Sequence, residues 1–323
     1  MFIVISTLVV KSQNFAPQVG FESTTAIHKD DAIFIDWANS VTITRGYKDI
    51  AIPNNGLVDY GVSSNAIGEA NLNVVSLGDG GEAVLSFNQS ITNGNGADFA
   101  VFENGFLEDE ESELAFLELA YVEVSTDGVD YVRFPSVSEN QIDTQIDGFG
   151  YMNARYIYNF AGKYIQNYGT PFDLSELILL VNGTTVDLDN INFIKLVDVV
   201  GTIDANFATH DNGNNIVNDP YPSNFSSGGF DLNAIGVINN TTTNSINKSE
   251  VISFSIFPNP VKESLTIITK STINLVEIYS MQGKLLFSIN SNHVNVDFLA
   301  NGIYLVSVET EMGKTSAKFI KTN

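Results

Sequence analysis

Residues 253–257, with the sequence Ser-Phe-Ser-Ile-Phe, open a run of short strand-like segments that continues almost to the end of the chain. In one of them Val276 and Ile278 alternate with Glu277 and Tyr279, which is the period of a strand with one buried face. The expected strands are residues 253–257, 264–269, 275–279, 284–289, 294–296, 302–309 and 314–320. Short strands at this spacing predict a small immunoglobulin-like β-sandwich over residues 252–323.

Three short motifs punctuate these strands, and they are Pro258-Asn259-Pro260, Gly283-Lys284 and Gly302-Ile303-Tyr304. The prolines mark a strand edge or the turn before it, and the glycines supply turns in which positive φ costs little. Together the motifs resemble a sorting domain of the type IX secretion system of Bacteroidota, type A. The resemblance implies export by the type IX translocon, a secreted or cell-surface location, and a surface sortase as a further partner. The alternative is an ordinary immunoglobulin-like module that packs on its neighbour.

The first 13 residues are the expected signal peptide, because residues 2–10 form an apolar run followed by small residues. The run lacks a positively charged segment before it, so either the start codon lies further upstream or the segment is a buried first strand. No apolar run reaches the roughly 18 residues of a membrane span, which predicts a protein without one. The absence of cysteine excludes disulfides, thiolate metal sites and cysteine nucleophiles.

The acidic charge lies in the larger, N-terminal part of the chain. Residues 254–323 carry a net charge of +1, whereas the whole chain carries −23. Such a negative field disfavours nucleic acid as a partner and favours divalent cations. Residues 239–251 are polar and without periodicity, which is typical of a linker. We therefore expect a passenger domain at residues 14–238 and the sorting domain at 252–323.

The passenger also has the patterns of an all-β domain. Its expected strands are residues 32–37, 40–44, 81–87, 98–102, 117–125, 130–134, 177–181, 193–200 and 229–237, with one short helical turn within 170–177. Long connections rich in Asn, Asp and Gly separate them. These features predict a jelly-roll-like antiparallel β-sandwich.

A second resemblance covers about residues 55–238. It rests on residues 75–81, 96–104, 161–164, 168–174, 197–201 and 228–236. These segments are similar to a family of bacterial secreted proteins described only as cell surface proteins. The resemblance implies no established activity.

Acidic and amide side chains suggest a calcium site. Asp211, Asn215 and Asp219 lie in a loop that offers many oxygen atoms, the ligands that calcium prefers, although the spacing departs from an EF-hand. The alternative is a surface loop held by its own side-chain to backbone hydrogen bonds. Glu103 falls at a strand end, and Asp198 and Asp231 lie in strand-like surroundings where burial would require a partner or a metal. If these groups meet, calcium is the expected cofactor.

Aromatic residues offer a binding surface for an extracellular ligand, with a glycan as one option. Tyr164 and Tyr168 lie in a Gly- and Asn-rich region, and Asn104 follows the strand that carries Glu103. Exposed rings beside amides suit the flat faces of sugars. The alternative is that the rings cover a long loop over the sandwich.

No catalytic motif is present in the sequence, so we expect a non-catalytic, surface-displayed protein that binds an extracellular ligand and calcium. Two alternatives remain open. One is a glycan hydrolase that uses a pair of carboxylates, whose separation depends on the fold. The other is a purely adhesive or scaffold module.

Overall fold

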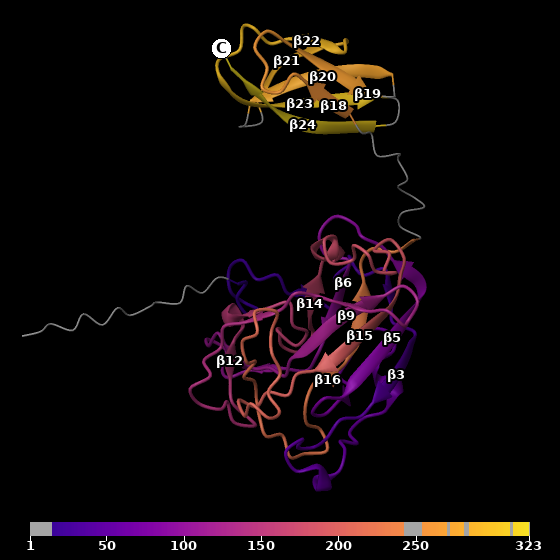
Figure 1. Cartoon of the computed structure of the whole chain (residues 1–323), viewed down its shortest axis with the longest axis vertical. Coiled ribbons are helices and arrows are strands. Elements are labelled where there is room, and N and C mark those ends of the chain that lie inside the picture. Colours follow the sequence, from indigo (N-terminus) through magenta and orange to yellow (C-terminus); the bar gives the residue numbers. More distant parts are fainter. Residues whose placement is uncertain (1–14, 242–253, 270–271, 281–283, 311–312, 323) are drawn as a thin grey trace, which may run out of the picture. The chain divides into compact units, whose positions relative to one another are not determined.

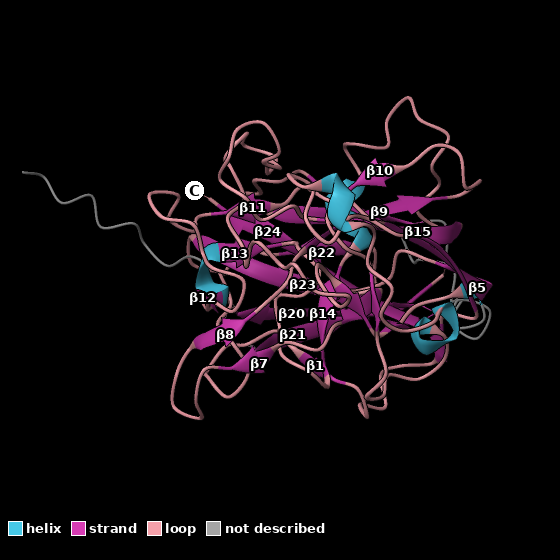
Figure 2. Ribbon diagram, turned by 90° about the horizontal axis from the view of Figure 1, so that it is seen from below, coloured by secondary structure: helices cyan, strands magenta, loops and turns pink. Residues whose placement is uncertain are grey.

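The computed structural model describes residues 15–241, 254–269, 272–280, 284–310 and 313–322. The chain divides into two compact units, Met1–Asn244 and Ser245–Asn323. Both are built from antiparallel strands, and the described helices are 3₁₀ turns of three or four residues (Figure 2). The predicted all-β class, a jelly-roll-like sandwich followed by a smaller sandwich, is confirmed. Within the described ranges, no helix combines the length and hydrophobicity that crossing a membrane requires.

The first unit is a sandwich of two five-stranded sheets. One sheet has the order β1 (Ile27–His28), β14 (Tyr168–Phe172), β6 (Phe99–Phe102), β17 (Ala234–Val237) and β2 (Asp36–Trp37). The other has the order β10 (Val132–Arg133), β9 (Ala120–Ser125), β15 (Ile191–Asp198), β5 (Glu82–Ile91) and β3 (Ser40–Thr44), four of which lie side by side in Figure 1.

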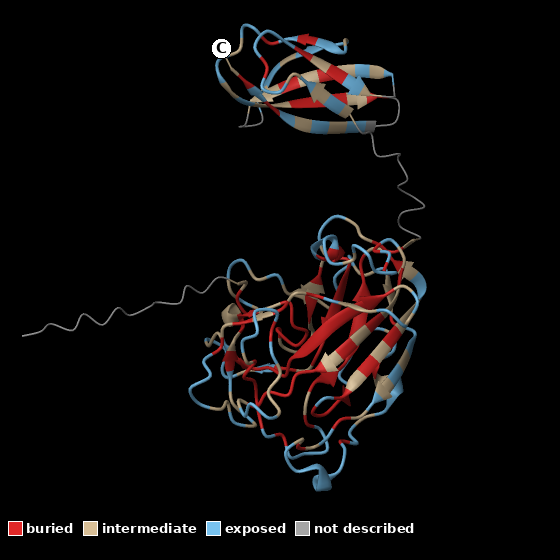
Figure 3. Cartoon of the chain, in the orientation of Figure 1, coloured by how far each residue is buried: buried red, intermediate tan, exposed pale blue. Residues whose placement is uncertain are grey.

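The core lies between these two sheets. Phe99 and Val101 of β6 meet Leu85, Val122 and Ile194 of the opposite sheet, all at most 1% exposed. The alternate residues of β6, Ala100 and Phe102, point the other way and pack in a second apolar cluster with Phe34 and Trp37. Both faces of β6 are therefore covered, which explains its unbroken apolar sequence, and Figure 3 shows the buried strands at the centre of the unit.

Three small sheets accompany the two large ones. They pair β11 (Val137–Ser138) with β13 (Ile157–Tyr158), β16 (Asp231–Leu232) with β4 (Val75–Ser76), and β8 (Leu114–Phe116) with both β12 (Met152–Asn153) and β7 (Phe106–Leu107). Four 3₁₀ helices, η1 (Pro53–Asn55), η2 (Ser63–Ala66), η3 (Ala154–Tyr156) and η4 (Leu174–Leu177), complete the connections.

The second unit is a sandwich of a three-stranded and a four-stranded sheet. The first has the order β18 (Phe254–Phe257), β19 (Ser264–Thr269) and β22 (His293–Asn295). The second has the order β21 (Leu285–Ile289), β20 (Ile273–Ser280), β23 (Gly302–Thr310) and β24 (Gly313–Lys321). Val276 and Ile278 are fully buried between the sheets, as their alternation predicts.

The sorting motifs meet at the end of β24. Asn259 accepts a hydrogen bond from Ile320 N (2.9 Å) and donates one to Lys318 O (3.3 Å), while Gly302, Ile303 and Tyr304 pair with residues 321, 320 and 319. The Tyr304 ring stacks on Phe319 at 5.6 Å. Two motifs that are far apart in the sequence thus fix the same terminal strand. Lys284 lies just before β21, with its carbonyl accepting a hydrogen bond from Ser280 N (2.9 Å).

One expected strand of the passenger is wrong. Residues 177–181 form turns that continue η4, because the amides of Leu180 and Val181 both bond to Leu177 O. The short helical turn expected before it is present, and its Asp173 cap accepts from Ser175 N (2.9 Å). Residues 1–13, Gly283 and nearly all of the linker at 239–251 lie outside the described residues.

Replacing Asn259 with alanine should loosen the end of β24. The change removes one bond to the Ile320 amide and one to the Lys318 carbonyl, each worth about 1 kcal/mol. In the full-length protein, amide hydrogen exchange at Ile320 should become roughly fivefold to tenfold faster. Asn259→Asp keeps the acceptor for the Ile320 amide, so its exchange rate should lie between those of the unchanged protein and of Asn259→Ala. An unchanged exchange rate in Asn259→Ala would contradict this role of the side chain.

Candidate metal centre

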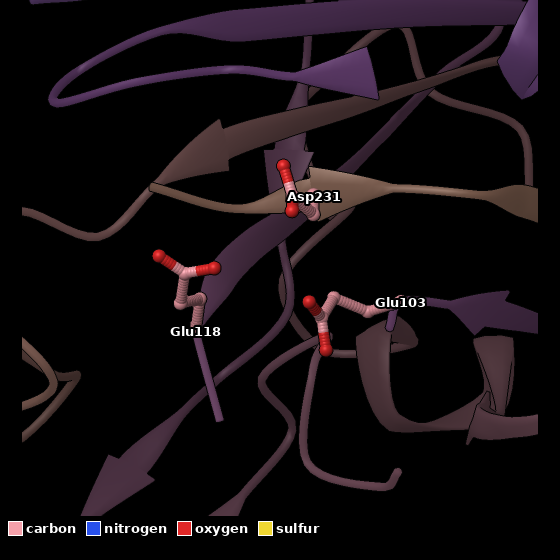
Figure 4. Close-up of side chains that lie close together, drawn as sticks. All are labelled: Glu103, Glu118 and Asp231. Carbon is pink, nitrogen blue, oxygen red and sulfur yellow. The ribbon is translucent and has the colours of Figure 1, made fainter. Parts of the chain in front are cut away.

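Three carboxylates converge in the interior of the first unit. Glu103, Glu118 and Asp231 are only 1%, 5% and 6% exposed, and one oxygen of each lies within 4.8 Å of the others. Figure 4 shows the three side chains approaching one another from separate segments of the chain. Glu103 follows β6, Glu118 lies between β8 and β9, and Asp231 begins β16. We call this group the carboxylate centre.

Local packing fixes where each carboxylate sits. Leu117 and Leu119 on either side of Glu118 are fully buried, so the backbone at Glu118 is held in the core. Gly162 presses against the Glu118 carbonyl, where a Cβ atom would come within 1.9 Å of the oxygen, and its φ of +82° also favours glycine. Asp231 is held by the pairing of β16 with β4. The centre is therefore a consequence of the fold and not of one flexible loop.

The hydrogen bonds leave part of the centre without donors. Glu103 Oε2 accepts from Gly105 N (2.6 Å), but Glu103 Oε1 is buried and has no hydrogen-bond partner. No hydrogen bond to the Glu118 carboxylate occurs among the described residues. Asp231 is better satisfied, since it accepts from the Ser76 hydroxyl and from Asn104 Nδ2 (3.1 Å). A buried acceptor without a donor is costly, so the open oxygens require a ligand or a proton.

No basic side chain neutralises the centre directly. Within the described part of the chain, none of the ion pairs involves Glu103, Glu118 or Asp231. The nearby Arg45 donates to the backbone carbonyls of Tyr60 (2.8 Å), Gly61 (2.7 Å) and Ser76. Its guanidinium therefore contributes only a longer-range attraction to Asp231.

Burial makes ionisation of these groups unfavourable in the absence of a cation. Burial and then repulsion from Asp231 raise the pKa of Glu103 well above its ordinary value, and the same two causes act on Glu118. Burial raises the pKa of Asp231 to about 6 despite its hydrogen bonds from Ser76 and Asn104. A divalent cation would reverse this balance by stabilising the ionised forms.

Three other buried acids accept hydrogen bonds from backbone amides of distant segments, although burial still raises their pKa values. Asp198 accepts from Phe230 N (2.7 Å) and Gly80 N (3.1 Å), and Asp219 accepts from Leu119 N (3.1 Å). Asp98 accepts from Gly94 N and Leu174 N, both at 2.7 Å. These carboxylates tie loops to the sandwich. Of the six expected metal ligands, the structure brings Glu103 and Asp231 together and leaves Asp198 and Asp219 outside the carboxylate centre.

The loop around Asp211 is closed by its own hydrogen bonds. Asp211 accepts from Gly213 N (2.8 Å), Asn215 N (2.8 Å), Asn215 Nδ2 and Ser138 N (3.0 Å). Burial acts to raise its pKa, but the hydrogen bonds outweigh that effect and the pKa is lowered. Asp211 and Asn215 thus satisfy each other, and they are not part of the carboxylate centre.

The expected ligand-binding tyrosines are not free surface rings. Tyr164 is 1% exposed and its hydroxyl shares a 2.7 Å hydrogen bond with the Thr25 hydroxyl, so the expectation of an exposed ring there is wrong. Tyr168 is half-buried in β14 and contacts the His28 ring edge-on at 5.0 Å. Asn104 holds the Asp231 carboxylate and so belongs to the support of the centre.

Other aromatic residues do form a surface. Tyr151, Phe106, Phe116, Phe149 and Phe225 contact one another in that order, with ring centroids 5.0–6.3 Å apart. Phe149 is 62% exposed and Phe225 is 51% exposed. We call these five rings the aromatic row. It adjoins the centre in sequence, since Phe106 follows Glu103 by three residues and Phe116 precedes Glu118 by two.

Glu118 and the aromatic row were missed at the level of sequence. Glu118 stands in the apolar segment Leu117-Glu118-Leu119, and an acid between two leucines in an expected strand was the available signal. Phe149 and Phe225 lie in loops separated by more than seventy residues, and no sequence period connects them.

Comparison with known proteins identifies the class of the second unit. Its seven strands form the small two-sheet sandwich of an export module, and residues 255–322 match the family described as the secretion system C-terminal sorting domain. This part of the chain is therefore a type IX secretion sorting domain, and the protein is exported to the cell surface or the medium.

No curated protein matches the chain. Among solved structures, one similar chain is described as "Biofilm associated protein - BSP domain", with 8% sequence identity and a TM-score of 0.20. The alignment covers 91% of this chain and 53% of the other, so this chain spans about half of its length. A likeness that weak carries no argument about the passenger.

Without a bound cation, the passenger should lose stability as the pH rises. Asp231 and Asp79, whose pKa values burial raises to about 6, ionise near 3.9 when unfolded. The folded state then binds more protons between pH 4 and 6, and the free energy of unfolding falls as pH rises through that window. With chelator present, Tm should drop by roughly 4 °C or more from pH 5 to pH 7.5. A Tm that rises over this range would contradict the assignment.

Proposed function

We propose that this exported protein displays a non-catalytic passenger that binds a calcium ion at the carboxylate centre and an extracellular ligand at its aromatic surface. The observation that carries the calcium assignment is the buried, unpartnered Oε1 of Glu103, a residue whose carboxylate lies within 4.8 Å of those of Glu118 and Asp231. A cation there would supply the positive charge and the electron-pair acceptor that the surrounding protein lacks.

The chemistry of the donors favours calcium over other metals. All three candidate ligands are carboxylates, which are hard oxygen donors, and the chain contains no cysteine. Calcium accepts six to eight oxygens in a flexible arrangement, whereas magnesium prefers a regular octahedron and retains several waters. A buried centre assembled from three separate segments suits the more tolerant ion. Glu103, Glu118 and Asp231 would hold it, and it would fasten those segments together.

The aromatic row supports a binding role for the passenger. Four of its rings are exposed, and the buried Phe116 links Phe106 to Phe149 beneath them. Exposed apolar patches on a soluble protein often mark an interaction surface. The position of the rings next to the segments that carry Glu103 and Glu118 means that calcium would also fix the backbone beneath the rings.

The same geometry favours binding over glycan hydrolysis. A hydrolase needs two carboxyl groups that face a shared cleft open to substrate. Glu103, Glu118 and Asp231 are buried, and none of them lines either of two cavities of the passenger that measure about 600 and 500 Å³. The non-catalytic proposal rests on this separation of the acids from the accessible cavities.

Calcium should raise the thermal stability of the full-length protein. Saturation at about 100 times the dissociation constant adds about 2.7 kcal/mol, which corresponds to a Tm increase of roughly 5–10 °C. Glu103→Gln and Asp231→Asn should remove most of that increase, because each removes a charged ligand. Differential scanning calorimetry with calcium and with chelator measures both effects.

Glu110→Gln is the matched control, because Glu110 is an exposed acid outside the centre. It should respond to calcium as the unchanged protein does. Equal calcium shifts in the Glu103→Gln and Glu110→Gln variants would refute this site, and the absence of any shift in the unchanged protein would refute the metal itself.

Removal of residues 254–323 should abolish surface delivery in a host with a type IX secretion system. The sorting domain supplies the export signal, whereas the passenger forms its own core. Protease accessibility on intact cells should show the full chain outside and the truncated chain retained. Undiminished surface exposure of the truncated chain would overturn the export route.

A further inference from the structure

The four-stranded sheet of the sorting domain carries apolar side chains on its outer face. Val276, Ile278 and Val306 point into the core, so the residues that alternate with them along β20 and β23 point outward. Pairing across the sheet brings the apolar members of this outward set together. We call them the outer stripe, and they are Leu285, Tyr279, Leu305, Ile303 and Ile320. The stripe runs across all four strands of the sheet.

The register places these side chains next to one another. Tyr279 lies opposite Leu285 on one neighbouring strand and opposite Leu305 on the other, and Ile303 lies opposite Ile320. Leu305 and Ile303 are two residues apart on β23 and share its outer face, which joins the two sets. Leu285, Ile303 and Ile320 are 46%, 51% and 43% exposed. The surface is therefore apolar and continuous.

The motif Gly302-Ile303-Tyr304 divides between the two faces of the sheet. Tyr304 packs against the core and stacks on Phe319, so it contributes to the fold. Ile303 points to the opposite face and lies outside the core cluster that the described residues form. Exposed apolar patches on a soluble domain mark interaction surfaces. The position of Ile303 is thus explained by a partner and not by packing within the domain.

The outer face of the three-stranded sheet is mixed in character. Ile268 lies opposite Ser255, and Thr266 lies between Phe257 and His293. Polar neighbours interrupt the apolar side chains on this face. The continuous stripe is therefore a property of the four-stranded sheet.

Lys318 gives the stripe a basic border. It lies opposite Leu305 and is exposed, and its side chain takes part in none of the ion pairs of the described residues. Lys314, on the same face of β24, differs because it pairs with Glu277 (2.5 Å). The unpaired ammonium group of Lys318 favours a partner that presents carboxylates beside an apolar surface.

We propose that the outer stripe is the surface through which the type IX secretion machinery recognises this sorting domain. The partner is a protein of that machinery, with an apolar surface that packs on the stripe and carboxylates that meet Lys318. This inference goes beyond the proposed function of the passenger and is independent of the calcium centre and of the aromatic row.

The extent of the family match favours this partner. The match covers residues 255–322, so it includes every member of the stripe and none of the passenger. A surface built entirely from the shared module suits a partner that receives many different passengers. A second copy of the chain suits it less, because each chain carries a net charge of −23 and two copies repel each other.

Two sets of changes test the stripe in the full-length protein, expressed in a host with a type IX secretion system. Ile303→Thr combined with Ile320→Thr should lower the fraction of the protein exposed on intact cells at least about fivefold, because two apolar contacts with the partner are lost. Lys318→Glu should lower it at least about threefold, because the charge at the border is reversed. Protease accessibility on intact cells measures this fraction.

Matched controls lie in the same domain but outside the stripe. Ile268→Thr makes the same apolar to polar change on the other sheet, where Ile268 is 58% exposed, and Lys262→Glu makes the same charge change at an exposed position. Both controls should leave delivery unchanged. Amide hydrogen exchange along β20 and β23 of the purified variants checks that the sheet is intact. If the double variant disturbs the sheet, Lys318→Glu decides the question alone.

Several results would overturn the proposal. Normal delivery of the double variant and of Lys318→Glu would do so, and so would an equal loss of delivery in Ile268→Thr. Faster exchange within the passenger of the double variant would show that the stripe covers this chain's own passenger instead. If removal of residues 254–323 abolishes delivery and the stripe variants do not, the export route stands and the stripe assignment alone fails.

Discussion

The passenger is organised around the burial of negative charge without matching positive charge. Taking a carboxylate out of water is favourable only if hydrogen bonds, a counter-ion or a proton compensate for the lost hydration. Backbone amides donate to Asp98, Asp198 and Asp219, although burial still raises the pKa of each. Glu103 keeps one buried oxygen without any partner. The acids that tie loops to the sandwich therefore differ from the carboxylate centre, where we propose that a cation binds.

The buried acids that accept backbone amides also explain how long irregular connections remain ordered. Asp98 joins the loop after β5 to the start of η4, and Asp198 joins the end of β15 to residues 80 and 230. Each carboxylate takes up amides that a regular strand would have paired with a neighbour. Some strands of the two large sheets can therefore be short, since side-chain hydrogen bonds replace part of the backbone hydrogen-bond ladder.

The sequence predicted regular structure well where one periodic rule applied. The seven described strands of the sorting domain were expected close to their observed bounds, because most of them bury one face. Residues 177–181 were wrongly expected to form a strand, since apolar composition alone does not distinguish a strand from a turn. Glu103 and Asp231 were recognised as candidates, but their meeting with Glu118 depends on packing between segments more than a hundred residues apart. Tyr164 was misjudged because a tyrosine in a polar loop can still turn its ring inward and bond through its hydroxyl.

The side chain of Asn259 covers part of an exposed sheet edge in the sorting domain. It occupies the outer backbone groups at the end of β24, with the adjacent Val261 taking up a further amide and carbonyl there. A strand at the edge of a sheet whose backbone groups are unpaired is a template on which another chain can add. Asn259 and Val261 occupy such groups at residues 318, 320 and 322, so this end of the edge is closed to a second chain. The same residues that carry the sorting signature thus also cap a sheet edge.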